Sequence, residues 1–431
     1  MVRILSWVSV PVLLLAAPLA GQDVEDPETV GIFFDCQTMG CRDLDYFRRE
    51  IPFVNWVRDR EVADVHVLVT SQQTGGGGSS YTLAFLGLGS FEDQDQDLTA
   101  SVGGDATEDD RRSAVARQLR LGLVRYVAAT PTGARLTVTV PGSGTEGAGE
   151  EAADAVRNDP WDFWVFRIGA NGFVNGEATS RFSNYSLSLS ADRTTETWKV
   201  DLSGRRSENR QRFELSDGDV VEAVRTDWSA SGSLVRSIGD RWAAGVRADA
   251  RSSTLLNQDL QVALRPGLEY NFFPYAESSR RSLTLQYLVG PVHFDYISET
   301  LFGRTEETRW EESLTAGLSL VQPWGRWSTS VSGSHYFHDI EKYSVDVSGS
   351  LNVRLFRGFS VRVAGNYSWI RDQLFIAAAG ATDEEILLRQ RQLETSYRYF
   401  TSFGIEYRFG SIFNNVVNPR FGGGGGEFFI F

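Results

Sequence analysis

Long segments in which apolar and polar residues alternate fill the C-terminal two-thirds of the chain. From Tyr343 to Leu355 every second residue is apolar, aromatic or glycine, and the residues between them are polar, without a slip. Strict alternation predicts a β-strand with one apolar and one polar face. The same alternation recurs in residues 242–251, 260–272 and 359–369. These segments are longer than the typical globular strand of about five or six residues.

About 12 such strands are expected between residues 163 and 409. An even number brings both ends of an antiparallel barrel to the same side of a membrane. Residues 171–180 are ambiguous, so counts of 10 or 14 stay open. The expected strands span residues 163–173, 182–191, 197–213, 220–236, 241–252, 260–272, 282–296, 310–321, 327–337, 343–355, 359–370 and 393–409.

Three features favour a closed membrane barrel over a soluble β-sandwich. Aromatic residues gather at the expected strand ends, as in the two girdles of outer-membrane barrels. Tight connections such as 238–240 and 323–325 alternate with long ones at 298–308 and 376–391. The polar faces carry Arg and Asp, where a sandwich would need a dry core. The aromatic residues at strand ends are Trp242, Trp310, Trp324, Trp327, Trp369, Tyr397 and Tyr399.

The last expected strand carries a terminal pattern. Residues 402–409 match the insertion signal of outer-membrane barrels, in which Gly404 is followed by aromatic residues at Tyr407 and Phe409. The match implies recognition by a barrel-assembly machinery and a location in the outer membrane of a Gram-negative cell. Residues 411–431 continue beyond this signal with a glycine run at 422–426, and we expect them to form a periplasmic tail.

The expected barrel resembles the family of uncharacterised salt-induced outer-membrane proteins, a domain of unknown function. The resemblance covers residues 160–410 and rests on the strand spacing and on the polar faces that carry Arg and Asp. It implies an outer-membrane barrel in contact with lipid, and it brings no catalytic residues with it.

A compact α+β domain is expected in residues 30–140, followed by a linker in residues 141–160. Its element order, with the apolar strand at residues 63–70 followed by a hairpin and a closing helix, resembles the amino-terminal domain of TolB-like periplasmic proteins. That resemblance implies a periplasmic protein-docking module. The expected elements are strands at 32–34, 62–70, 81–88 and 97–102, and helices at 43–58 and from residue 108.

The first 21 residues are expected to form a secretory signal peptide. Arg3 precedes an apolar run over residues 4–17, and the small residues at 16–21 supply a cleavage site. The run is short for a membrane anchor, which needs about 20 apolar residues. Cys36 and Cys41 would then lie in an oxidising compartment, which favours a local disulfide over the alternative of two free thiols.

The composition excludes two classes of protein. The 431 residues carry a formal net charge of −14, which argues against a nucleic-acid partner, because such binding depends on clustered Lys and Arg. The mean hydropathy is −0.23, far below that of a helical membrane protein. A barrel averages its lipid-facing and lumen-facing residues, so it can share the hydropathy of a soluble protein.

Charged residues on the polar faces should line the barrel interior. Cations outnumber anions among them, which favours a positive lumen and the passage of small anions. The alternative is that these side chains pair across strands and close the lumen. The residues expected to line the lumen are Arg247, Asp249, Arg251, Arg265, Glu269, Asp346, Arg354, Arg362, Arg398, Glu406 and Arg408, together with Arg167, Lys199, Asp201 and Arg205.

No catalytic, metal or cofactor motif is expected in the chain. His335 and His338 lie near one strand end, but residues three apart on a strand point to opposite faces. An outer-membrane phospholipase carries a serine two residues after its histidine, and Phe337 occupies that position. His66 is expected to be a core residue. The sequence therefore predicts a non-enzymatic barrel that passes small solutes and docks a periplasmic partner, with a closed-lumen docking protein or an outer-rim hydrolase as alternatives.

Overall fold

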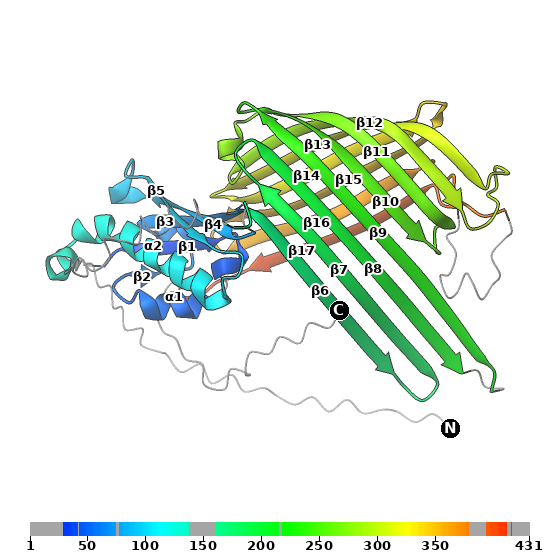
Figure 1. Cartoon of the computed structure of the whole chain (residues 1–431). Coiled ribbons are helices and arrows are strands. Elements are labelled where there is room, and N and C mark those ends of the chain that lie inside the picture. Colours follow the sequence, from blue (N-terminus) through cyan, green and yellow to red (C-terminus); the bar gives the residue numbers. More distant parts are fainter. Residues whose placement is uncertain are drawn as a thin grey trace, which may run out of the picture.

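In the computed structural model the chain forms two β-sheets that contact each other (Figure 1). The structure describes residues 29–41, 43–74, 77–137, 160–214, 218–378, 394–411 and 415. The expected signal peptide, nearly all of the linker and most of the tail lie outside the described residues.

The N-terminal domain is a five-stranded sheet in the order β2-β1-β3-β4-β5. Strand β1 pairs in parallel with β2 and β3, and β4 and β5 continue the sheet antiparallel. Figure 1 shows both helices on one face of this sheet. The elements are β1 (Gly31–Cys36), α1 (Leu44–Glu50), β2 (Asn55–Trp56), β3 (Val65–Gln73), β4 (Ser79–Gly87), β5 (Gln96–Val102) and α2 (Glu108–Ala128).

The helices and one face of the sheet enclose the core of the domain. Leu119 and Leu123 of α2 and Phe47 of α1 are fully buried against Val67 and Leu83. Helix α2 starts with a capping box in which Thr107 and Asp110 satisfy each other's backbone groups. Three consecutive acidic residues in its first turn also suit the positive end of the helix dipole.

The expected helix over residues 43–58 is shorter than predicted. Helix α1 ends at Glu50, because Pro52 lacks the backbone N–H that the next turn would need. The chain then extends into β2, which adds a short parallel strand beside β1. Ile51, Val54 and Val57 are three residues apart, a spacing that fits a helix, so periodicity alone predicted a helix as far as residue 58.

The C-terminal part is a single antiparallel sheet of 12 strands, which confirms the predicted fold class and strand number. Neighbours in sequence are neighbours in the sheet throughout. The strands are β6 (Trp164–Gly176), β7 (Ser180–Thr194), β8 (Trp198–Glu214), β9 (Val220–Ile238), β10 (Trp242–Ser253), β11 (Gln258–Asn271), β12 (Arg281–Tyr296), β13 (Glu306–Gln322), β14 (Gly325–Tyr336), β15 (Asp339–Phe356), β16 (Phe359–Ile370) and β17 (Tyr397–Tyr407).

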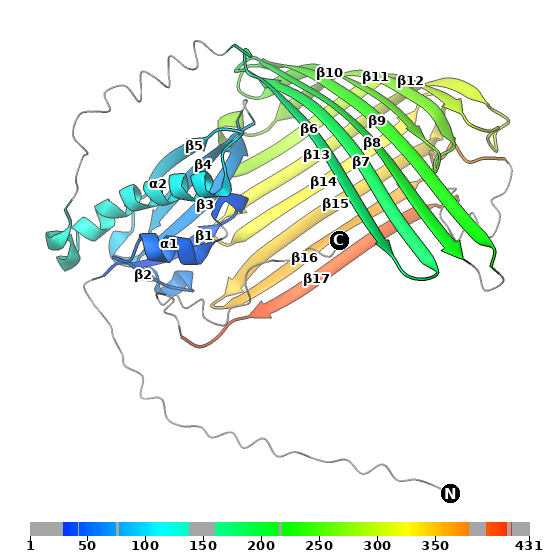
Figure 2. The same ribbon diagram turned by 60° about the horizontal axis from the view of Figure 1, so that its bottom comes forward.

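The 12-stranded sheet curls into a barrel-like wall (Figure 2). Side chains two strands apart converge on the concave face of such a wall. Arg265 of β11 donates to Glu311 of β13 across β12, where Gly290 has no side chain to intervene. The concave face therefore carries the residues that alternation predicted to point inward.

The sheet is not closed by a backbone ladder among the described residues. Its order runs from β17 to β6 without a pairing between these two strands, so the expectation of a closed cylinder is not met there. The alternation of side chains reports which face is apolar but carries no information on whether the first and last strands pair, so the sequence could not settle closure.

The convex face is apolar and exposed. Leu264, Leu268 and Leu314 are each about half exposed on it. Exposed aromatic residues flank this band at both strand ends, as expected for girdles at a membrane interface. They include Trp198, Trp242, Trp324, Trp327 and Tyr407 at one end, and Trp310, Phe337, Trp369, Tyr397 and Tyr399 at the other.

Candidate functional site

Hydroxyl groups and charges cover the concave face of the 12-stranded sheet, which we call the inner wall. The strand register places Ser203 beside Ser231 and Ser328 beside Ser350, and each pair is hydrogen-bonded at 2.8 Å. The face carries serines on strands from β7 to β15. Its other serines include Ser188, Ser190, Ser229, Ser233, Ser330, Ser332 and Ser348.

The register places the residues expected to line the lumen on this same face. They do not form one cluster but are distributed over the sheet from β6 to β17. Arg247 and Arg265 face each other on β10 and β11, as do Arg251 and Gln261. Arg362 and Glu406 join β16 to β17 by an ion pair.

Several acidic residues that the sequence analysis did not assign also lie on the inner wall. Asp192 pairs with Arg167, Glu311 with Arg265, and Glu307 with Arg309. Asp192 and Glu307 lie just beyond the predicted strand ends, so they were counted as loop residues. The interior is therefore less positive than the alternation alone indicated, and much of its charge is paired.

The N-terminal domain covers the end of the barrel that has the short turns (Figures 1 and 2). Its contacts follow the rim. Gly77, in the β3–β4 turn, lies against Arg167 of β6, and Gln72 donates to Ser278 between β11 and β12. At the other side of the rim Asn415, beyond β17, accepts a hydrogen bond from the backbone N–H of Trp56 at 2.7 Å.

The sheet face that lacks helices supplies the interface with the barrel. Leu68 and Ala84 are buried there against Val321 at the end of β13. This contact explains why β3 is buried on both faces, with helices on one side and the barrel on the other. Whether the domain caps the barrel or swings on its linker was open from sequence, and the structure shows it docked.

An ion pair between a buried carboxylate and a part-exposed guanidinium joins the two sheets. Arg354 of β15 donates from Nη1 to Oδ2 of Asp35 at 2.7 Å, and its guanidinium lies over the ring of Phe33. Burial raises the pKa of Asp35, but interactions with His66 and Arg354 outweigh that effect and hold it at about 2. Asp35 is therefore ionised, and Arg354 offsets its charge.

His66 is fully buried beside this ion pair. Its Nδ1 accepts a hydrogen bond from Nε of Arg60 at 3.1 Å, and its Nε2 lies 3.4 Å from Asp35 Oδ2. Burial lowers the pKa of His66, and the charges of Arg60 and Arg354 lower it further, against the opposing effect of Asp35. The imidazole is neutral at pH 7, as a core histidine should be, but it lies at the domain interface.

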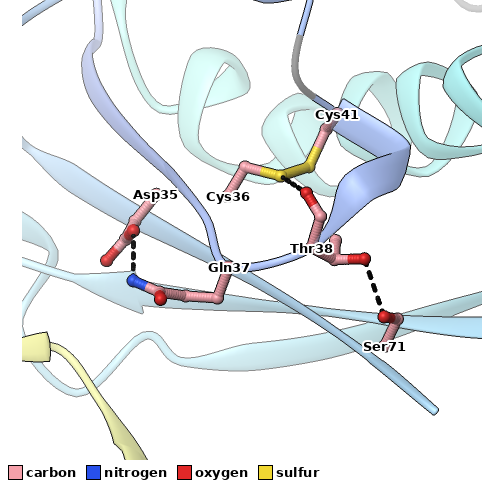
Figure 3. The surroundings of a disulfide bond; sticks show 6 residues. All are labelled: Asp35, Cys36, Gln37, Thr38, Cys41 and Ser71. Carbon is pink, nitrogen blue, oxygen red and sulfur yellow. Dashed lines mark hydrogen bonds between the residues drawn. A yellow bond between two sulfur atoms is a disulfide. The ribbon is translucent and has the colours of Figure 1, made fainter. Parts of the chain in front are cut away.

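A disulfide between Cys36 and Cys41 closes the loop that follows β1 (Figure 3). The Thr38 hydroxyl in this loop hydrogen-bonds Ser71 of β3 at 2.7 Å. Gln37 donates from Nε2 to Asp35 Oδ1 at 2.8 Å, which orients the carboxylate toward Arg354. The disulfide thus constrains the segment that presents Asp35 to the barrel.

The opposite end of the barrel is covered by residues 371–378, which we call the inserted loop. Leu374 is buried on the inner wall against Phe294, Tyr296 and Tyr336. The backbone is held by hydrogen bonds from Leu301 N–H to the Ile376 carbonyl and from the Asn257 amide to the Phe375 carbonyl. The inserted loop therefore occupies part of the inner wall at this end, opposite the N-terminal domain.

The two histidines near the outer rim are not brought together. His335 lies on the convex face, where Nε2 is 2.7 Å from Oε1 of Glu312, and His338 packs near Tyr336. The contacts of His335 are with Glu312, the Tyr336 carbonyl and the Phe337 ring. None of these groups is a serine or cysteine nucleophile.

The residues of the terminal pattern lie on the edge strand and just after it. Tyr407 and Phe409 are exposed, and Gly404 has open space where a Cβ would stand. Within the described ranges, no helix is long and apolar enough to cross a membrane. No group of three or more His, Cys, Asp or Glu residues there could hold a metal ion.

Comparison with known proteins gives a family match for much of the barrel. Residues 171–375 match the model of a family described as a protein of unknown function, DUF481. The match supports the expected resemblance to a domain of unknown function, over a shorter range than residues 160–410. It does not include the N-terminal domain, so the resemblance to the TolB amino-terminal domain stays a prediction.

Solved structures also match the chain, and one of them is a porin. It is described as the NanC porin in a rhombohedral crystal form, and the similarity spans 57% of this chain and 100% of that chain. The two share 8% sequence identity, with a TM-score of 0.28. No curated protein matches the chain.

Proposed function

We propose that the protein is a porin-like outer-membrane barrel that passes small polar solutes along its inner wall. The observation that supports this most is the contrast between the two faces of one sheet. The convex face has an apolar band between aromatic residues, and the concave face carries serine hydroxyls and ion pairs. A wall of this kind suits lipid on one side and water on the other.

The N-terminal domain would lie in the periplasm and close the path at rest. It contacts the rim at the end that has the short turns, which is the periplasmic end of bacterial barrels. Its ion pair, Asp35 with Arg354, holds it in that position. Solute passage would then require the domain to leave the rim, and binding of a periplasmic protein partner would supply a reason for it to do so.

Conductance of the full-length protein in planar lipid bilayers tests this proposal. The Arg354→Glu variant places a second carboxylate beside buried Asp35, and like charges at that distance should displace the domain. We expect few openings in the unmodified protein and a higher open fraction in Arg354→Glu. Arg304→Glu, in an exposed loop at the opposite end, is the matched charge reversal and should behave as the unmodified protein.

A closed-lumen docking protein is the second candidate. It is favoured by the covers at both ends, the docked domain and the inserted loop. No conductance above background in any of the three proteins, with the fold intact by circular dichroism, would support it and contradict the pore.

The rim histidines define the test of a hydrolase. We propose that the protein is not an enzyme, since His335 contacts a carboxylate and no nucleophile on the convex face. Lipid or peptide hydrolysis by the purified protein that His335→Ala and His338→Ala abolish would contradict this.

A further inference from the structure

A concave pocket of about 390 Å³ lies on the inner wall between β8 and β12. Its side chains include Lys199, Asp201, Ser231, Arg247 and Glu269. This volume is within the usual range for pockets that bind small molecules, about 300–1,000 Å³. The pocket lies in the half of the inner wall next to the short turns, where β8 and β10 begin and β9 and β11 end, along the proposed solute path.

Two glycines face each other in the floor of the pocket. Gly245 of β10 pairs with Gly267 of β11, so two neighbouring strands lack side chains at the same level. A Cβ on Gly267 would lie 2.4 Å from a Leu288 methyl group and 2.2 Å from the Tyr287 carbonyl oxygen. The hollow is therefore a fixed feature of the backbone, with Leu288 and Val235 as its apolar sides.

Two cations beside this hollow have unused hydrogen-bond donors. Lys199 lies 3.6 Å from Asp201, and Arg247 lies 3.5 Å from Asp249, distances of ion pairs rather than of good hydrogen bonds. Both side chains are more than half exposed. Arg265, on the next strand, differs in donating three hydrogen bonds to Asp249 and Glu311 and in being only 15% exposed.

The two acidic residues of the pocket differ in how many of their acceptor positions are already used. Glu269 accepts from the Tyr275 hydroxyl at 2.9 Å and from the Gln286 amide at 3.0 Å, so both of its oxygens are occupied. Asp201 accepts from Ser233 at 3.0 Å and has lone pairs left for another donor. The pocket thus offers cationic donors, one carboxylate acceptor and the Ser203–Ser231 hydroxyl pair.

We propose that this pocket binds a small hydroxylated carboxylate. The ligand's carboxylate would accept hydrogen bonds from Arg247 and Lys199, since charge-assisted contacts to guanidinium are strong and directional. Its hydroxyl groups would pair with Asp201 and Ser231, and its C–H faces would lie over the glycines. The inference deepens the proposed solute path, because it places a selective binding site along it.

Isothermal titration of the detergent-solubilised full-length protein with gluconate tests the site. Gluconate carries one carboxylate and a row of hydroxyls, and sorbitol is its neutral counterpart. Lys199→Gln with Arg247→Gln should weaken gluconate binding at least about tenfold, because two charge-assisted contacts are lost. Sorbitol should bind the unmodified protein at least about tenfold more weakly than gluconate.

Arg205→Gln is the control, because Arg205 is also on the inner wall on β8 but does not line the pocket. Its affinity for gluconate should equal that of the unmodified protein. The titrations are repeated in Arg354→Glu, so that a covered entrance cannot hide a working site. No binding in either background, equal affinity in the double variant, or equal affinity for sorbitol would overturn the proposal.

Titration separates this inference from the proposed pore. Gluconate binding in a protein without conductance would support the site and contradict the pore. Conductance in a protein that does not bind gluconate would support the pore and contradict the site.

Discussion

Both sheets of this chain contain strands with alternating apolar and polar residues, but the apolar face is buried in one sheet and exposed in the other. In the N-terminal sheet the apolar face is fully buried under helices, and side chains such as Val67 and Leu83 have no exposed surface. In the 12-stranded sheet the apolar face is the exposed one, with Leu314 at 48% exposure, and polar groups occupy the enclosed side. Alternation therefore indicates that the two faces of a sheet lie in different environments. Other features of the sequence decide whether the apolar face contacts a protein core or lipid.

The largest difference between the sheets should appear when a leucine is truncated in each. Leu119→Ala in α2 leaves a cavity in a closed core and should lower the free energy of unfolding of the domain by about 2–5 kcal/mol. Leu314→Ala removes a side chain from an open surface and should change stability by only about 0.5 kcal/mol.

Denaturant titrations of the two variants, followed by near-ultraviolet circular dichroism, measure both changes. Equal losses would mean that the convex face of the 12-stranded sheet is packed against protein, against our account.

The interface between the sheets should be sensitive to acid. The pKa of Asp35 is lowered from 3.8 to about 2 in the folded protein, so its contribution is complete above pH 3.8 and is lost as the pH falls toward 2. That contribution is about 2 kcal/mol. The pKa of His66 is also lowered, so an earlier loss begins as the pH falls below 6.5, where the unfolded chain takes up a proton first.

Acid titration of the stability of the domain should therefore show two steps. A different substitution should remove each step. Asp35→Asn should remove the lower step and His66→Gln the upper one. A profile that is flat from pH 7 to pH 3 in the unmodified protein would contradict the buried arrangement of these groups.

The disulfide should matter to the N-terminal sheet alone. Replacing Cys36 and Cys41 by serine opens a short loop and should cost the domain about 2 kcal/mol. The segment that presents Asp35 would lose its constraint, so the lower acid step should also weaken. Strand content and heat resistance of the barrel should stay the same, and a loss there would show that the two sheets fold as one unit.

The last prediction concerns the two edge strands of the large sheet and is read from a cross-link. Unpaired backbone groups in lipid cost several kcal/mol each, so β6 and β17 should meet in a membrane. Ile168→Cys combined in turn with Thr401→Cys, Phe403→Cys or Ile405→Cys should give a cross-linked band in proteoliposomes for one partner. No cross-link with any of the three would mean that the wall remains open.

Much of the fold could be predicted because the alternation in each strand is long and regular. All 12 strands of the large sheet were placed from this signal, whereas the helices of the domain were predicted from helical spacing and α1 is shorter than expected. Acidic residues such as Asp192 and Glu307 were missed because they lie at strand ends, where periodicity cannot fix the boundary.

The interface was harder to predict because its partners are distant in sequence. Asp35 and Arg354 are 319 residues apart, and the sequence of neither strand indicates that it contacts the other. One signal was present, since Asp35 and His66 interrupt apolar strands. Polar residues in buried strands require partners, so these two could have indicated a contact with another part of the chain. The floor of the pocket was not predicted, because the sequence does not give the register that places Gly245 opposite Gly267.

Cysteine scanning along β15 in proteoliposomes tests the central claim, that this sheet separates lipid from water. Single cysteines at Val347 and Leu351 on the convex face, and at Ser348 and Ser350 on the inner wall, are treated with a water-soluble thiol reagent. We expect rapid labelling at the two serine positions and slow labelling at the two apolar positions. Equal labelling at all four, or a protein that stays soluble without detergent, would contradict the account.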